Sequence, residues 1–130
     1  MIDDHFNDIE KAIKNDPFVV FSDFNRIHTS SVTVYIKGVI KFIDGTSLCI
    51  FQHARIKEKY LIITDYRFHY MNKENMVVFR YDSAPHNPEI RTFPHHKHTS
   101  SGIEPSPKMP KIAEILDEIR SYIIKGIISG

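Results

Sequence analysis

Apolar and polar residues alternate along the chain between residues 18 and 83, where Val, Ile, Phe, Tyr and Thr are frequent. Alternation at every second position is typical of strands that bury one face. Short polar turns divide this region into five predicted strands, at residues 18–28, 32–43, 46–56, 60–71 and 76–83. In the second strand the residues expected on the buried face are Val32, Val34, Ile36, Ile40 and Phe42. Asp44-Gly45 favours a type I′ hairpin turn, so the strands are predicted to form an antiparallel meander.

Helical periodicity flanks the strands on both sides. Apolar residues at helical spacing predict an amphipathic helix over residues 3–15 and a second helix over residues 110–125. Together these elements predict an α+β fold: an antiparallel meander of about five strands with an N-terminal and a C-terminal helix. Both helices should pack on one face of the sheet, and residues 1–130 should form a single domain.

The last predicted hairpin has a testable register. If Met71 pairs with Met76, aromatic residues of both strands share the core face, and Arg67 lies directly opposite Arg80 on the other face. Directly opposed like charges are unfavourable. Two arrangements would offset them: diagonal ion pairs with aspartates on a solvated face, or an anion held between the two arginines.

Proline then interrupts every regular pattern. Six of the seven prolines fall between Pro85 and Pro110, and residues 84–109 are predicted to be a long functional loop. Its first part is not typical of disorder, because it holds four of the chain's eight histidines, which are His86, His95, His96 and His98.

Composition limits the class of protein. The formal net charge of +1 argues against a polycation that grips nucleic acid along its whole length. Cys49 is the only cysteine, which excludes an intrachain disulfide and a cysteine zinc cage. The acidic start lacks a signal-peptide core, and no apolar run approaches the ~20 residues of a membrane span. We therefore expect a soluble cytoplasmic protein with no membrane partner.

The segment FRYDSAPHNPEIRTFPHHKH, residues 79–98, resembles the TumE-type toxins of bacterial and archaeal toxin–antitoxin pairs. Members of that family run from a strand ending in R-[YW]-D-N-A-P-H-H through an acidic link to T-F-P-H-H-K-H. The residues that match are Arg80, Asp82, Ala84, Pro85, His86, Thr92, Phe93, Pro94, His95, His96, Lys97 and His98. The chain departs from the pattern at Ser83, where the family usually has asparagine, and at Asn87, where it usually has a second histidine. The resemblance spans roughly residues 30–120 and implies a small toxin with a cognate antitoxin protein as its partner.

Clustered histidines and cations suit the cleavage of RNA without a metal or other cofactor. A base removes the 2′-hydroxyl proton, an acid protonates the leaving oxygen, and cations stabilise the charge on phosphorus. The candidate catalytic residues are Arg80, Asp82, His86, His95, His96, Lys97 and His98. The candidate substrate-binding residues are Arg67, His69 and Arg91. We expect His86, His96 and His98 on one side, with Arg80 and Lys97 beside them and His95 turned toward Arg80 or Asp82.

Other functions remain open from the sequence. His95 and His98 form an H-x-x-H motif to which His86 could add a third ligand, so a metal-dependent hydrolase is one alternative. A binding protein without chemistry, in which the histidine loop is a structural clasp, is another. Ile127 and Ile128 extend beyond the second predicted helix and are a candidate interface for a homodimer or another partner.

Overall fold

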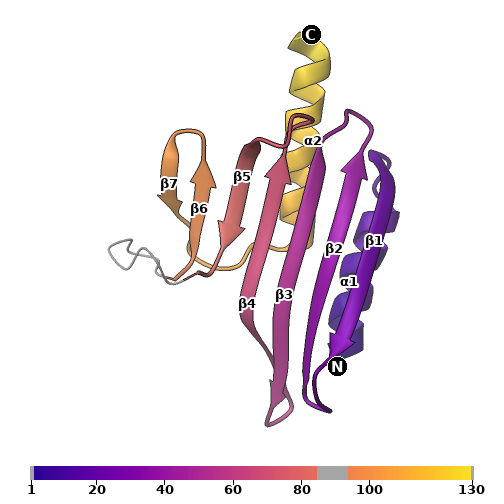
Figure 1. Cartoon of the computed structure of the whole chain (residues 1–130), viewed down its shortest axis with the longest axis vertical. Coiled ribbons are helices and arrows are strands. Elements are labelled where there is room, and N and C mark those ends of the chain that lie inside the picture. The colour runs from indigo at the N-terminus through magenta and orange to yellow at the C-terminus, as the bar shows by residue number, and fades with distance from the viewer. Residues whose placement is uncertain (1, 85–93, 130) are drawn as a thin grey trace.

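The computed structural model describes residues 2–84 and 94–129, which form one antiparallel sheet covered on one face by two helices (Figure 1). Seven strands follow one another across the sheet in chain order, from β1 at one edge to β7 at the other. The helices are α1 (Ile2–Lys14) and α2 (Ile112–Ser129). The strands are β1 (Val19–His28), β2 (Thr33–Phe42), β3 (Ser47–Lys57), β4 (Tyr60–Met71), β5 (Val77–Asp82), β6 (His96–Thr99) and β7 (Gly102–Pro105). The predicted α+β meander with a helix at each end is confirmed, with two more strands than expected.

The core lies between the sheet and the two helices. From α1 it takes Phe6, Ile9 and Ile13, and these residues recur at helical spacing and are at most 4% exposed. The core residues from α2 are Ile115, Leu116, Ile119 and Ile123. Of the residues expected on the core face of β2, Val34, Ile36, Ile40 and Phe42 are buried, whereas Val32 precedes the strand and is 46% exposed. The opposite face of the sheet, called the outer face below, is not covered by either helix (Figure 1).

The turn between β2 and β3 forms a hairpin as predicted, but it is not of type I′. That type needs positive φ at both central residues, and of Asp44 and Gly45 only the glycine has a positive φ, of 87°. The Asp44 carboxylate instead accepts a hydrogen bond from the backbone N–H of Thr46 at 3.1 Å. Two successive positive φ values occur one hairpin later, at Glu58 (53°) and Lys59 (74°).

The predicted register between β4 and β5 is wrong by two residues, although the predicted faces are right. Phe68 pairs with Tyr81 on the core face, and Arg67 pairs with Asp82 on the outer face. One residue of this shift is already present beside the turn, where Met71 pairs with Val77 rather than with Met76. The irregularity between Tyr70 and Met71 adds the other, because a β-bulge adds an unpaired residue to one strand. Arg67 therefore lies opposite a carboxylate rather than opposite Arg80, and the like-charge conflict does not arise.

A hairpin occupies much of the segment that was expected to lack regular structure. β6 pairs with β5, and β7 pairs with β6, so residues 96–105 extend the sheet. The prediction of a continuous loop over residues 84–109 is therefore wrong for this part. Each of the two strands has only four residues, which is too short for a clear alternation of apolar and polar positions.

The second helix is longer than predicted, and it forms an ion pair with the segment between α1 and β1. It continues to Ser129, so Ile127 and Ile128 lie on the helix and are 64% and 79% exposed. Arg120 donates to the buried carboxylate of Asp16 at 2.6 Å.

Within residues 2–84 and 94–129, neither helix has the length and apolar character needed to cross a membrane.

Candidate active site

Two rows of polar side chains cross the outer face over β4, β5 and β6. In an antiparallel sheet, paired residues on adjacent strands point to the same face. The first row consists of Arg67, Asp82 and His96. The second row consists of His69, Arg80 and His98. The sheet therefore gathers six of the predicted site residues although they span more than thirty positions of the chain.

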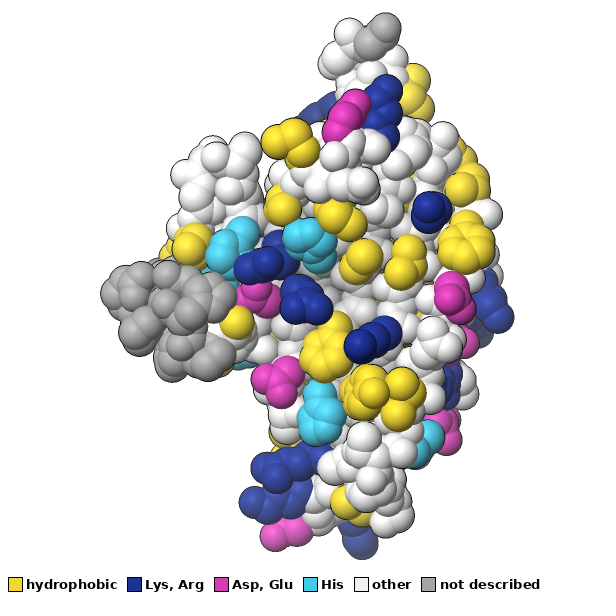
Figure 2. All heavy atoms as spheres, viewed as in Figure 1, with side chains coloured by type: hydrophobic (Ala, Val, Ile, Leu, Met, Phe, Trp, Pro, Cys, Tyr) yellow, Lys and Arg dark blue, Asp and Glu magenta, His cyan; other side chains and the backbone are white. Residues whose placement is uncertain are grey.

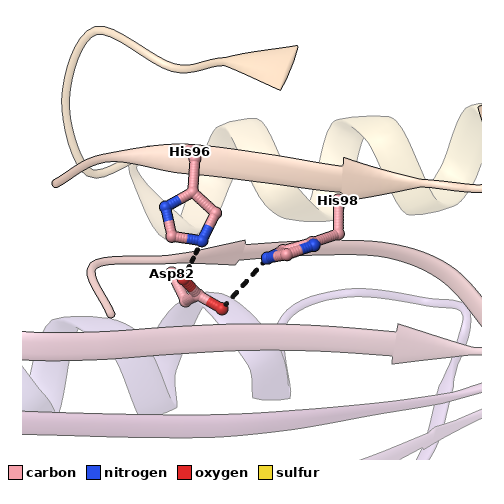
Figure 3. A group of neighbouring side chains, drawn as sticks. All are labelled: Asp82, His96 and His98. Atoms are coloured by element: carbon pink, nitrogen blue, oxygen red, sulfur yellow. Dashed lines mark ion pairs between the residues drawn. The ribbon is translucent and has the colours of Figure 1, made fainter. Parts of the chain in front are cut away.

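Asp82 is the centre of this group. Its side chain is only 4% exposed, and Arg80 Nε lies 2.8 Å from its Oδ2 atom. From β6, the rings of His96 and His98 point toward the same carboxylate (Figure 3). His96 Nε2 is 2.5 Å from Oδ1, and His98 Nε2 is 3.7 Å from Oδ2. A carboxylate this deeply buried needs such partners, because an unpaired charge would be strongly destabilising there.

His96 acts as a support for Asp82. Its side chain is 2% exposed, so it is withdrawn from solvent. Its Nδ1 atom lies 2.8 Å from the carbonyl oxygen of Pro94, which can only accept a hydrogen bond. Nδ1 therefore carries a hydrogen, and Nε2 is the nitrogen that faces the carboxylate. This arrangement fixes the ring between the backbone and Asp82.

His98 is more accessible and lies beside a cation. Its side chain is 20% exposed, and Arg80 Nη2 lies 3.4 Å from its Nε2 atom. The His96 and His98 rings meet edge to face, with centroids 4.7 Å apart. The predicted placement of His96 and His98 on one side is thus confirmed.

His69 flanks Arg80 from the other side, on β4. Burial lowers the pKa of His69 below its ordinary value, and the charges of Arg80 and Arg67 lower it further. Its Nδ1 atom is buried and has no hydrogen-bonding partner among the described residues. A neutral imidazole between two cations can accept a proton near pH 7.

A depression in the outer face adjoins this group. Its volume is about 260 Å³, and Arg67, Arg80 and Asp82 are among the residues that line it. In the space-filling view, histidine, basic and acidic side chains gather on this part of the face (Figure 2). The arrangement can hold an anion against two guanidinium groups with an imidazole nearby.

Lys97 does not join the group, and the prediction that it lies beside the histidines is wrong. Adjacent residues of a strand point to opposite faces, so Lys97 projects toward α2, where its Nζ lies 2.7 Å from Glu118 Oε2. Tyr81 donates to the other oxygen of Glu118, also at 2.7 Å. Burial lowers the pKa of Lys97, but its interactions with Glu118 and Tyr81 outweigh this and leave the pKa raised. The lysine is held in its charged form and links β6 to α2.

His95 is also placed differently from the prediction. Instead of facing Arg80 or Asp82, its ring stacks on Tyr66 with centroids 5.7 Å apart. Its Nδ1 atom is 2.9 Å from the tyrosine hydroxyl. Burial raises the pKa of Tyr66, and the negative charge of Asp82 raises it further.

Two residues that contact the predicted site residues were not predicted from the sequence, and two predicted site residues lie outside the described part of the chain. Tyr66 and Glu118 were not predicted to contact site residues, because no local motif links them to the histidine segment. The alternation of an extended segment separates His95 from His96, and the same alternation would have placed Lys97 away from the two histidines. The predicted site residues His86 and Arg91 lie outside the described residues.

A metal ion could also use part of this site. Asp82, His96 and His98 each offer a ligand atom, and these atoms lie within 4.8 Å of one another. Imidazole nitrogens and a carboxylate oxygen are suitable ligands for zinc. The bond from His96 Nδ1 to a backbone carbonyl also resembles the support that metal-binding histidines commonly receive. This set differs from the H-x-x-H set suggested by sequence, because His95 faces Tyr66.

Comparison with known proteins identifies one family. The family model described as "Toxin TumE" matches residues 9–127, which is most of the chain. No curated protein and no solved structure matches it.

Proposed function

The chain belongs to the TumE toxin family, and on that premise we propose that this toxin of a toxin–antitoxin system is an endoribonuclease that needs no metal. Family membership implies a cognate antitoxin as its partner. RNA is the proposed substrate, and the outer face over β4–β6 is the proposed active site.

The observation that carries this proposal is the position of Arg80 between two imidazoles. His69 and His98 are its cross-strand partners on either side. Neighbouring strands are about 4.8 Å apart, so the two histidines are separated by roughly 10 Å of sheet. A phosphate bound at Arg80 would have one imidazole toward each side. In-line cleavage of RNA needs this arrangement, because the attacking 2′-oxygen and the leaving 5′-oxygen lie on opposite sides of phosphorus.

Each residue then has a definite role in the proposed reaction. Neutral His69 removes the proton of the 2′-hydroxyl group, and His98 gives a proton to the leaving oxygen. Arg80 and Arg67 stabilise the negative charge that develops on phosphorus. Asp82 acts through its partners by positioning Arg80 and His98, and His96 holds Asp82 in place.

Cleavage of total RNA by the purified protein, in excess EDTA, tests this function. The wild type should degrade the RNA, and His69→Gln and His98→Gln should each slow degradation by about 100-fold or more. His28→Gln is the matched control, because His28 is 53% exposed on the edge strand β1. It should cleave like the wild type. If the purified protein leaves the RNA intact but its expression still arrests growth, the proposal is refuted, and a binding toxin without chemistry is favoured.

A metal-dependent hydrolase is the second candidate, favoured by the convergence of Asp82, His96 and His98. It predicts that EDTA abolishes cleavage and that added zinc restores it. It also predicts stoichiometric metal in the purified protein by elemental analysis, and loss of that metal in His96→Gln. The metal-independent mechanism predicts unchanged cleavage in EDTA.

A further inference from the structure

We propose that the outer face of β2–β4 binds a single-stranded segment of RNA next to the cleaved bond, with Phe51 stacking on a base and Lys37 and Arg67 contacting phosphates. This inference rests on the proposed function for its substrate class. It concerns residues that the catalytic chemistry does not use, apart from Arg67.

The first row of the active site continues across the sheet. Asp82 pairs with Arg67, Arg67 with Phe51, and Phe51 with Lys37. All four side chains therefore project from the outer face. At about 4.8 Å per strand, Phe51 lies roughly 10 Å along the sheet from Asp82. That distance is short enough for a base on Phe51 to belong to a nucleotide adjacent to the reacting phosphate.

The aromatic residues of this surface are interleaved with cations. The guanidinium of Arg67 lies 5.8 Å from the centre of the Phe51 ring. On its other side, Phe51 contacts Tyr35 with ring centroids 6.2 Å apart. Lys37 Nζ is 6.0 Å from the Tyr35 ring. Aromatic rings that stack on bases, set among cations that neutralise phosphates, are the usual means of binding single strands.

A second depression leads from this surface to the active site. Its volume is about 240 Å³, and Lys37, Phe51 and Arg67 help to line it. Phe51 and Arg67 also line the depression beside Asp82, so the two hollows adjoin. Hydrophobic and basic side chains lie across the same part of the face in the space-filling view (Figure 2).

The charges on this surface favour a nucleic acid over an acidic or neutral peptide. Lys37 and Arg67 contribute two positive charges beside the aromatic rings. Asp23, on β1, is the carboxylate among the residues that line this hollow, and Asp65 and Asp82 line the adjoining one. We therefore place the single-stranded RNA between β2 and the active site and exclude β1 from the contact.

Fluorescence anisotropy with a labelled, single-stranded 2′-O-methyl oligonucleotide isolates binding from cleavage, because the modified sugar lacks the attacking hydroxyl. The wild type should bind it, and Phe51→Leu should weaken binding by about 10- to 100-fold. Phe51→Tyr keeps the ring and should bind as the wild type does. The matched control is Phe21→Leu, since Phe21 is a 50% exposed phenylalanine of edge strand β1 and should not affect binding.

The salt dependence of RNA affinity measures the phosphate contacts independently. Arg67→Gln should reduce the slope of log affinity against log salt by about 1, because one phosphate contact is lost. Thermal unfolding of each variant, followed by circular dichroism, shows whether it is folded under the conditions of the binding assay.

The two proposals fail in different ways. Equal affinity of folded Phe51→Leu and the wild type would overturn the RNA-binding surface, even if RNA is still cleaved. Binding that depends on Phe51, without any cleavage of unmodified RNA, would support the surface while refuting the nuclease. An equally tight complex with a blunt RNA duplex would also overturn it, because paired bases cannot stack on Phe51.

Discussion

Replacing Lys97 with methionine separates a structural role from a catalytic one. The substitution keeps the aliphatic stem and removes the ammonium group that joins β6 to α2. The lost interactions are the hydrogen bond to Glu118 at 2.7 Å and the contact with the Tyr81 ring at 4.9 Å. The lysine side chain is 20% exposed and the glutamate 35% exposed.

The expected loss of stability follows from these contacts. A hydrogen bond between charged groups contributes about 1.5–3 kcal/mol when buried, but solvent screening around Glu118 brings this nearer to 1 kcal/mol. The cation–π contact adds about 0.5–1 kcal/mol. Lys97→Met should therefore lower the free energy of unfolding by about 2 kcal/mol, which moves the urea midpoint by about 1 M.

Urea unfolding followed by circular dichroism measures this change. Glu118→Gln should be destabilising too, and the double variant should show a coupling energy of about 1 kcal/mol with Lys97→Met. Lys111→Met, at an exposed lysine, is the control and should stay within about 0.5 kcal/mol of the wild type. Below the unfolding transition, folded Lys97→Met should cleave RNA at close to the wild-type rate. Unchanged stability together with loss of cleavage would refute the structural role and restore Lys97 as a catalytic candidate.

Four further predictions test other features. Gly38→Ala should cost about 1–3 kcal/mol in urea unfolding, because its Cβ would lie 2.3 Å from Phe24 Cε1, and Phe24→Leu should recover part of that cost; equal stability of Gly38→Ala and the wild type would contradict this. Lys59→Gly should raise the melting temperature, since the left-handed conformation at φ 74° costs a non-glycine residue about 1–2 kcal/mol, which exceeds the entropic cost of glycine. Because the fold lowers the pKa of His69, the unfolded state binds more protons than the folded state as the pH falls below about 6.5. The free energy of unfolding should therefore decrease as the pH is lowered through this range, and urea unfolding of His69→Gln should lack this contribution. The exposed end of α2 is a candidate interface for a homodimer or another partner, and for a homodimer Ile128→Glu should halve the mass measured by light scattering, whereas a monomeric wild type would refute the dimer.

The sequence was sufficient for the first five strands of the sheet and for part of the site. Alternation is strong in β2, β3 and β4 because each of these strands has buried residues at every second position over much of its length, and this made the meander predictable. The register of β4 and β5 was not predictable, because the pairing of Met71 with Val77 at the turn and the bulge near Tyr70 depend on how the hairpin closes rather than on the pattern of apolar residues. That shift decides whether Arg67 faces a carboxylate or another arginine.

The failure at Lys97 has a simple physical origin. The sequence predicts a loop over residues 84–109, with Lys97 beside His96 and His98. This part of the chain is a strand over His96–Thr99, and alternation puts His96 and His98 on one face while it sends Lys97 to the other. A motif of adjacent polar residues can thus belong to two sites at once, one chemical and one structural.

The order of the strands also determines when the histidine–arginine group can form during synthesis. Every strand of the sheet pairs with the strand next to it in the chain, so no strand must wait for a distant partner. β1 to β4 can therefore associate as they leave the ribosome, whereas His96 and His98 emerge later, on β6, and α2 follows them to cover the core. A nascent chain has only part of its histidine–arginine group until β6 has been made. Under the proposed function, it cannot cleave RNA before that point.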